Sequence, residues 1–193
     1  MKIESSSTHI MGVHTLQVPL RCDDRGGFGR VFCAETCAGL GGFTSIAQIN
    51  QSQNTNRGTV RGLHFQRPPH AESKIIICLT GSVFDVVVDL RKNSPTYGQH
   101  VSVTLHAHSG AGIVVPKGCA HGFQTLEDDS RLLYLHDVSY AQGFEGGVHP
   151  LDSRLGIQWP LPTEIMSQRD RSLPHLAQVM PIELHPLSEE SVS

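Results

Sequence analysis

Side chains able to move protons and bind anions stand close together in two segments of the chain. The first contains Arg61 and His64, with Lys74 shortly after. An imidazole exchanges protons near neutral pH, and guanidinium and ammonium groups bind anions. Side chains alternate along an extended strand, so Gly62, His64 and Gln66 would share one face. The segment therefore predicts the floor of a cationic pocket, unless these are simply solvated residues at a strand edge.

The second segment spans residues 112–123 and carries His121 directly after a Pro-Lys-Gly turn at 116–118. Its pattern predicts a strand, a tight turn and then a histidine near the start of the next strand. In cupin barrels this layout directs the histidine into the mouth of the barrel. The plainer interpretation is a buried histidine that is hydrogen-bonded beside a hairpin.

A metal site is the competing interpretation of these histidines. Metal-binding cupins usually carry a His-x-His pair followed by a carboxylate, together with a histidine like His121. Here His64 and His70 are six residues apart, a pair of prolines interrupts the strand between them, and Glu72 lies beyond that turn. This spacing is poor for a shared metal ion, so a mechanism without metal or cofactor is favoured over a metal-dependent cupin enzyme.

Tyr134 and Asp170 are not distinguished by pattern alone. A lone tyrosine in a strand usually packs in the core, and a lone aspartate near a turn usually caps it. Five further histidines stand at spacings that form no site, and the sequence predicts them to be surface or internally satisfied residues: His100, His106, His108, His136 and His149.

The elements that would position these residues are mostly short β-strands separated by turns rich in glycine and proline. Apolar or alternating runs predict strands at 43–52, 75–79, 82–90, 100–107, 113–115 and 131–138. The run 82–90 alternates between an apolar face and a face that carries Asp85 and Asp89. A helical pattern is visible mainly near 164–170. The strand pattern therefore predicts an all-β sandwich or jelly-roll barrel with a few short helices, mainly C-terminal. The histidine layout at 112–123 is that of a cupin-type jelly-roll barrel.

The length of 193 residues fits one domain, with a barrel core at about 13–160, a wrapping segment at 161–187 and a polar tail at 188–193. The formal net charge of −3 provides no basic surface for nucleic acid or for a membrane. The polar N-terminus does not resemble a signal peptide, and the apolar runs are too short to span a bilayer. The five cysteines form no CxxC motif, which favours free thiols in a cytoplasmic protein.

Ordered blocks through most of the chain, from about residue 13 to 176, resemble the dTDP-4-dehydrorhamnose 3,5-epimerase family of the cupin superfamily. The matching blocks are Asp24-Arg25-Gly26, Gln48-Ile49-Asn50, 61–66 (RGLHFQ), 81–91 (GSVFDVVVDLR), 94–98 (SPTYG), 116–123 (PKGCAHGF), 155–160 (LGIQWP) and Ser167-Gln168-Arg169-Asp170. The resemblance implies a homodimeric jelly-roll enzyme without metal or coenzyme. Such an enzyme inverts C3 and C5 of a 4-keto-6-deoxyhexose attached to dTDP.

The resemblance also implies roles for individual residues. His64 falls on the catalytic base, Asp170 on the acid that orients it and Tyr134 on the proton donor. Lys74 falls on a substrate contact, where it would stabilise the enolate oxygen as a fourth catalytic residue. The positions implied to bind the substrate, some of them across the dimer, are Arg25, Phe28, Gln48, Asn50, Arg61, His121, Tyr140, Glu145 and Arg169.

Three positions depart from the pattern of that family. Arg30 stands where a glutamate is usual, Lys117 replaces the glutamate of a Pro-Glu-Gly turn, and Arg169 replaces a lysine. Because Arg30 reverses a charge near the expected nucleotide, GDP and CDP sugars stay as alternatives to the dTDP sugar. Epimerisation at C3 alone or at C5 alone is the other alternative within this reaction class.

Overall fold

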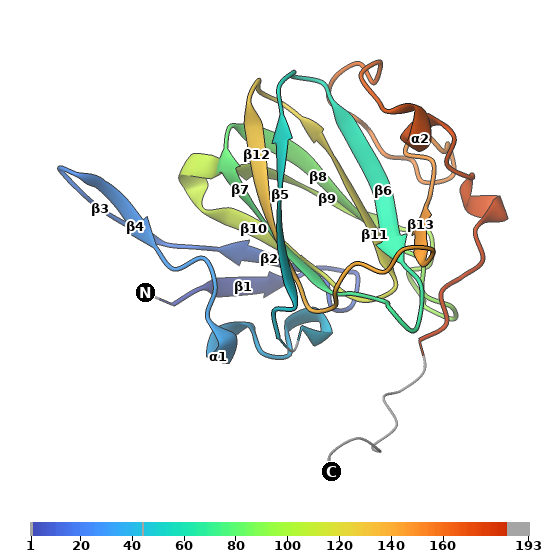
Figure 1. Cartoon of the computed structure of the whole chain (residues 1–193), viewed down its shortest axis with the longest axis horizontal. Helices are drawn as coiled ribbons and strands as arrows, with labels where there is room; N and C mark the ends of the chain where they lie inside the picture. The colour runs from blue at the N-terminus through green and yellow to red at the C-terminus, as the bar shows by residue number, and fades with distance from the viewer. Residues whose placement is uncertain (1, 44, 185–193) are drawn as a thin grey trace, which may run out of the picture.

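The computed structural model describes residues 2–43 and 45–184, in which two antiparallel sheets face each other (Figure 1). The six-stranded sheet has the order β1 (Glu4–Ser7), β2 (His14–Gln17), β10 (Ala111–Val115), β7 (Lys74–Thr80), β12 (Ser130–His136) and β5 (Gln48–Asn54). The five-stranded sheet has the order β13 (Glu145–Gly147), β6 (Val60–Gln66), β11 (Cys119–Thr125), β8 (Ser82–Asp89) and β9 (His100–His106). This architecture confirms the predicted all-β, cupin-type barrel.

The predicted strands correspond to observed strands with shifts at their ends. The largest shift is in β5, which begins at Gln48 rather than at residue 43. A separate hairpin pairs β3 (Leu20–Asp23) with β4 (Gly26–Gly29) and projects from the barrel (Figure 1). The short helices are α1 (Ala34–Cys37), η1 (Leu40–Gly42), η2 (Ala107–Ser109), α2 (Gln168–Arg171) and η3 (Leu176–Gln178). These helices lie in both halves of the chain. They were expected mainly at the C-terminal end, and the structure differs in this respect.

Apolar side chains fill one part of the space between the sheets. They project inward from β7, β8, β10 and β12 and from the turn before β2: Ile10, Val13, Ile76, Cys78, Val83, Val87, Ile113, Val115 and Leu132. We call these residues the interior core. Every one of them is buried, and burial of apolar surface is the main favourable contribution to folding.

Segments with little regular structure cover the outer face of each sheet. On the six-stranded sheet, Phe43 and the α1 residue Cys37 pack over Ile75 and Ile77 of β7. On the five-stranded sheet, apolar residues of the segment 148–182 pack over β6 and β8. The run 75–79 is apolar on both faces because one face meets the interior core and the other meets this outer cover.

Strand β8 shows the same two-sided burial and places the two aspartates of its alternating pattern. Its apolar face, with Val86 and Val88, lies under the C-terminal segment, whereas Val83 and Val87 point between the sheets. Asp85 stands two residues from each of them and so shares their inward face, and its side chain is fully buried. The polar face of the pattern is therefore the inward face of the barrel.

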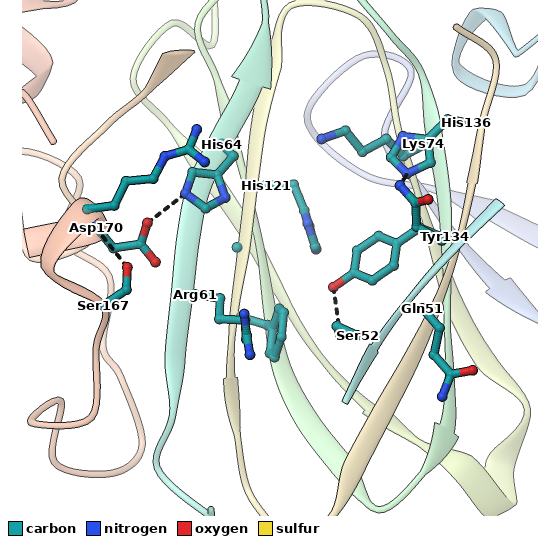
Figure 2. A pocket seen from close by; sticks show the side chains of 14 residues that line it. Gln51, Ser52, Arg61, His64, Lys74, His121, Tyr134, His136, Ser167 and Asp170 are labelled. Carbon is teal, nitrogen blue, oxygen red and sulfur yellow. Dashed lines mark hydrogen bonds and ion pairs between the residues drawn. The ribbon is translucent and has the colours of Figure 1, made fainter. Parts of the chain in front are cut away.

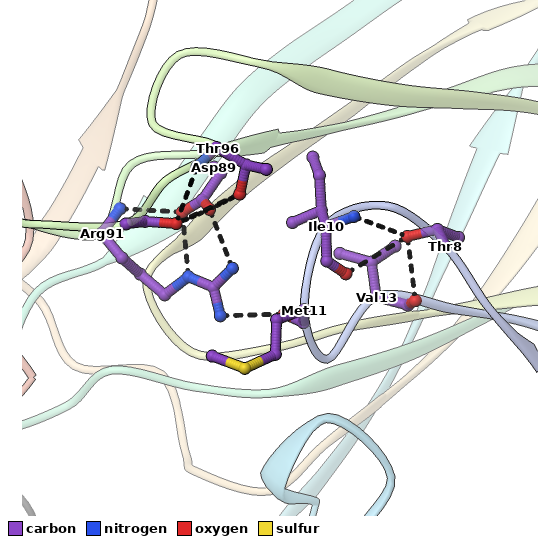
Figure 3. A network of polar contacts seen from close by, with 8 residues as sticks. Thr8, Ile10, Met11, Val13, Asp89, Arg91 and Thr96 are labelled. Atoms are coloured by element: carbon purple, nitrogen blue, oxygen red, sulfur yellow. Dashed lines mark hydrogen bonds and ion pairs between the residues drawn. The ribbon is translucent and has the colours of Figure 1, made fainter.

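A buried polar network ties the N-terminal turn to the end of β8 (Figure 3). Asp89 accepts hydrogen bonds from the guanidinium of Arg91 at 2.8 and 2.9 Å and from the hydroxyl of Thr96 at 2.6 Å. Arg91 also donates to the carbonyl of Met11 at 2.9 Å. Burial alone would raise the pKa of the Asp89 carboxyl, but these donors outweigh it and lower the pKa to about 2.

All five cysteines carry free thiols. Over the residues described, no helix combines the length and apolar character needed to cross a bilayer. The predicted polar tail, 188–193, lies outside the described residues.

Candidate active site

A cavity of about 380 Å³ opens between the two sheets beside the interior core (Figure 2). Most of its lining is polar or aromatic and comes from β5, β6, β7, β11, β12 and α2: Asn50, Gln51, Ser52, Arg61, His64, Lys74, His121, Gly122, Phe123, Tyr134, His136, Ser167, Arg169 and Asp170. All four residues predicted to be catalytic and four of the predicted binding residues, Asn50, Arg61, His121 and Arg169, are in this set. The cavity is therefore the candidate active site.

A register shift in β6 brings Arg61 and His64 to the same cavity. His64 pairs with His121 and Arg61 with Phe123, so three steps along β6 match two along β11. Strict alternation would have placed Arg61 and His64 on opposite faces. At the shift Gly62 has φ +112°, and a Cβ there would lie 2.6 Å from the backbone of Gly122, so glycine is required.

His64 and Asp170 form a hydrogen-bonded pair at one side of the cavity. Nε2 of His64 lies 2.7 Å from Oδ1 of Asp170, although the two residues are 106 positions apart in the chain. The hydroxyl of Ser167 caps α2 by accepting from the Asp170 amide at 3.0 Å, and the amide of Gly62 donates to Oδ2 at 3.3 Å. These contacts fix the carboxylate, whose side chain is 5% exposed, whereas His64 is 37% exposed and open to the cavity.

The Asp170 carboxylate is ionised at neutral pH. Burial would raise its pKa, but the hydrogen bond and charge of His64 outweigh burial and lower it. An ionised carboxylate can only accept, so a neutral His64 ring carries its proton on Nε2 and keeps Nδ1 free to take another. Asp170 thus sets the tautomer that a general base requires.

Tyr134 lies on the sheet opposite His64, and in Figure 2 the two side chains appear on either side of His121, which lines the same cavity. Its hydroxyl is 3.3 Å from Oγ of Ser52, and its ring meets His121 edge-on with centroids 6.0 Å apart. Burial raises the pKa of Tyr134 well above its usual range. The phenol therefore stays protonated and can donate a proton from the side facing the base.

Lys74 reaches the cavity from β7 and is held by Glu72, which lies in the turn before that strand. Their Nζ and Oε1 atoms are 2.9 Å apart, and the other carboxylate oxygen is 2.7 Å from Nδ1 of His136. His136, predicted to be a surface or internally satisfied residue, is satisfied by this hydrogen bond, and its ring also lines the cavity. It stands two residues after Tyr134 on β12, and that spacing alone would have placed both on one face.

His121 projects into the cavity from β11, as the Pro-Lys-Gly pattern predicted, and is buried. Its Nε2 lies 2.8 Å from Oδ2 of Asp85, which the sequence placed on the polar face of β8 without a function. Arg61 crosses to the opposite sheet, where its Nε donates to Oδ1 of Asn54 at 2.6 Å. The guanidinium therefore bridges the two sheets at the edge of the cavity.

A second hollow adjoins the cavity and shares His64, Lys74 and Arg169 with it. The predicted binding residues Tyr140 and Glu145 line this hollow, where the tyrosine hydroxyl donates to the glutamate. Oε1 of Glu145 is also 3.5 Å from Nη2 of Arg169.

Gln48 lies next to this hollow. Its side-chain oxygen accepts from the backbone amide of Tyr140 at 2.9 Å. Its side-chain nitrogen donates to Oδ1 of Asn50 at 3.0 Å, so these two predicted binding residues contact each other.

Arg25 and Phe28 are not among the residues that line either hollow. Both lie on the projecting β3–β4 hairpin (Figure 1), where Arg25 pairs with Asp23 at 2.6 Å and Phe28 is 71% exposed. Within one chain, these two predicted binding residues are therefore separated from the others.

The three-histidine metal set considered above is not assembled. His70 packs against the ring of Phe144 with centroids 4.5 Å apart and is not part of the cavity lining. Within residues 2–43 and 45–184, no three His, Cys, Asp or Glu side chains come together as a group that could hold a metal ion.

Comparison with known proteins gives consistent matches over most of the chain. A family profile described as dTDP-4-dehydrorhamnose 3,5-epimerase matches residues 7–178. A dTDP-4-dehydrorhamnose 3,5-epimerase from Streptomyces griseus is 40% identical over 173 residues, covering 89% of this chain and 86% of the relative. A dTDP-4-dehydrorhamnose 3-epimerase from Streptomyces niveus is 39% identical over 170 residues, covering 88% and 82%.

A solved structure agrees with these sequence matches. The dTDP-6-deoxy-D-glucose-3,5-epimerase from Legionella pneumophila, in complex with dTDP-4-keto-L-rhamnose, superposes with a TM-score of 0.88. It shares 32% sequence identity, and the match covers 95% of this chain and 100% of that one.

Proposed function

Because the chain belongs to the dTDP-4-dehydrorhamnose 3,5-epimerase family, we propose that it converts dTDP-4-dehydro-6-deoxyglucose to dTDP-4-dehydrorhamnose. The reaction inverts C3 and C5 by removing and returning protons. The observation that carries this proposal is the placement of the His64–Asp170 pair and the Tyr134 phenol on opposite walls of one cavity, beside Lys74.

The substrate ketone at C4 makes the protons on both C3 and C5 acidic. His64 removes one of these protons through Nδ1, and the C–H electrons move into the C4 carbonyl to give an enolate. The Lys74 ammonium stabilises the negative charge on O4, the contribution that often dominates such reactions. Tyr134 then delivers its proton to the carbon from the opposite face, which inverts that centre. The imidazolium of His64 releases its proton to solvent, and the Tyr134 phenolate takes one from solvent, which restores both groups.

The remaining predicted binding residues suit the nucleotide diphosphate. Arg61 presents a guanidinium fork at the edge of the cavity, and Arg169 stands between the two hollows. Tyr140, which is 56% exposed in the second hollow, offers a ring on which a base could stack. The sugar would thus occupy the cavity and the nucleotide the adjoining hollow.

The projecting hairpin supports a homodimer in which Arg25 and Phe28 complete the site of a second copy. Mixed dimers test this arrangement. A dimer formed from a His64→Asn chain and an Arg25→Ala chain would contain one intact site, so mixing the two impaired proteins should restore activity. No restoration, or a monomer in light scattering, would contradict the arrangement.

Epimerisation at C3 alone is the second candidate, because the Streptomyces niveus 3-epimerase is nearly as similar to this chain as the 3,5-epimerases are. The two reactions use the same base and donor and differ in whether the intermediate re-binds for the second proton removal.

The free thiols favour a reducing compartment, so we place the reaction in the cytoplasm.

One experiment tests the function. The protein is incubated with dTDP-4-dehydro-6-deoxyglucose in deuterium oxide, and the H3 and H5 signals are followed by NMR. The 3,5-epimerase loses both signals, whereas a 3-epimerase loses H3 alone. Retention of both signals with dTDP, GDP and CDP substrates would refute the proposal.

A further inference from the structure

Three side chains form a buried polar chain at one wall of the cavity: Lys74, Glu72 and His136. One oxygen of the Glu72 carboxylate accepts from Nζ of Lys74 at 2.9 Å, and the other accepts from Nδ1 of His136 at 2.7 Å. The side chains of Lys74, Glu72 and His136 are 9%, 8% and 11% exposed. The carboxylate is therefore held from both ends and is largely removed from water.

The direction of each hydrogen bond follows from that carboxylate. Because Glu72 accepts from Nδ1, a neutral His136 ring carries its proton there and keeps Nε2 as an acceptor. The Nδ2 atom of Asn50 lies 3.4 Å from that Nε2 and donates to it, while Asn50 Oδ1 accepts from Gln48 at 3.0 Å. The polar chain thus runs from Lys74 to the edge strand β5.

We infer that Glu72 and His136 are positioning residues for Lys74. The carboxylate keeps the ammonium charged and aimed at the cavity, and the N–H of His136 fixes the carboxylate. The use of Lys74 as the enolate-stabilising group rests on the proposed function, whereas the pairing itself can be measured without substrate. A buried ammonium loses its hydration, so its charged form needs a paired anion.

The charge state of Glu72 supports this arrangement. Burial would raise the pKa of its carboxyl, but the hydrogen bond from His136 and the charge of Lys74 outweigh burial and lower it. Glu72 is therefore an anion throughout the neutral range.

The other groups around Lys74 would not replace that anion. Besides Glu72 and His136, the titratable and charged side chains that share its two hollows are Arg61, His64, His121, Tyr134, Tyr140, Glu145, Arg169 and Asp170. Asp170 is bonded to His64, and Glu145 to Tyr140 and Arg169. Asp137, next to His136 in the chain, pairs with Lys117 at 3.3 Å. Each of these anions has a partner other than Lys74, so the Lys74 ammonium depends on Glu72.

Lysine-selective ¹³Cε labelling tests the pairing directly, because the chain has four lysines, Lys2, Lys74, Lys92 and Lys117. The Lys74 signal is assigned by its loss in Lys74→Arg. In Glu72→Gln its titration midpoint should fall by about one pH unit or more. The matched control is Glu183→Gln, which removes the carboxylate 3.0 Å from the exposed Lys92 and should move the Lys92 midpoint far less.

Two substitutions separate the hydrogen bond of His136 from its packing. His136→Asn keeps an N–H close to the position of Nδ1, whereas His136→Leu removes it at similar volume. We expect His136→Leu to lower kcat about tenfold or more with KM changed less than about threefold, and His136→Asn to recover most of that loss. In Glu72→Gln the alkaline limb of the kcat profile should move to lower pH with the Lys74 midpoint.

The outcomes are distinct. An unchanged Lys74 midpoint in Glu72→Gln overturns the inference, whatever the protein catalyses. Equal kcat in His136→Asn and His136→Leu overturns the part assigned to His136. If the unmodified protein exchanges neither ring proton while the Lys74 midpoint falls as expected, the proposed function fails and the pairing stands.

Discussion

The space between the two sheets has two parts that the same strands build in different ways. On β7, Lys74 lines the cavity while Ile76 and Cys78 belong to the interior core. On β12, Tyr134 and His136 line the cavity while Leu132 belongs to that core. Position along an inward face therefore decides whether a side chain serves packing or chemistry. Substitutions in the core should therefore change mainly stability, and substitutions in the cavity should change mainly turnover.

The largest expected effect is on turnover. His64→Asn removes the general base, so deuterium exchange at C3 and C5 should fall about 10³-fold. The melting temperature should change by no more than a few degrees, because His64 is partly exposed and is not one of the residues of the interior core. His106→Asn, at an exposed site on β9, is the matched control. A slow variant that also unfolds easily would show that the two parts are not separable.

Next in size is a loss of stability from the core. Leu132→Ala removes a fully buried side chain and should lower the free energy of unfolding by about 3 kcal/mol in a denaturant titration. Leu151→Ala, at a site 42% exposed, should cost less than about 1 kcal/mol. The folded fraction of Leu132→Ala should keep its kcat within about threefold. A tenfold loss of kcat would show that the core shapes the cavity.

Tyr134→Phe examines a residue that belongs to both parts, since its ring packs against the core and its hydroxyl faces the cavity. Removing the proton donor should lower kcat about 10²-fold. Stability should change by less than about 1 kcal/mol, because one hydrogen bond of 3.3 Å is lost. Tyr97→Phe serves as the control. Near-normal epimerisation by Tyr134→Phe would remove this residue from the mechanism.

The smallest expected effect concerns pH and the network around Asp89. Its pKa is lowered to about 2 in the folded protein, so the unfolded chain binds the extra proton between about pH 4 and 2. The ionised Asp89 carboxylate therefore stabilises the folded protein by about 2 kcal/mol. This contribution is complete above pH 4 and is lost as the pH falls towards 2. Asp89→Asn should flatten that part of the stability curve, whereas the exposed Asp24→Asn should not. An equally steep curve in Asp89→Asn would assign the acid sensitivity elsewhere.

Much of the fold could be predicted because strand alternation is a local property of the sequence. The runs that became β7, β8 and β9 were predicted to within about one residue at each end. The segments that cover the outer faces of the two sheets were harder to predict from the sequence. Segments such as 148–182 contribute scattered apolar residues that acquire their role only when packed against β6 and β8.

The candidate site was harder to predict from the sequence, because its hydrogen-bonded pairs join distant parts of the chain. Asp170 is 106 residues from His64, and only the family resemblance brought them together. Glu72 was considered solely as a metal ligand because it lies in a turn, where alternation gives no direction. His136 was judged by its own spacing rather than by its distance from Tyr134 on the same strand.

The extra residue in β6 makes the geometry of the site depend on how many residues separate Arg61 from His64, as well as on which residues they are. Substitutions in this stretch change one side chain at a time. A single insertion there, with the one-residue bulge kept, would move His64 from its place opposite His121 to one opposite Ala120 and reverse the direction of its side chain. The imidazole would then face away from the sugar in a barrel of almost unchanged composition, so the length of this strand is itself a requirement for catalysis.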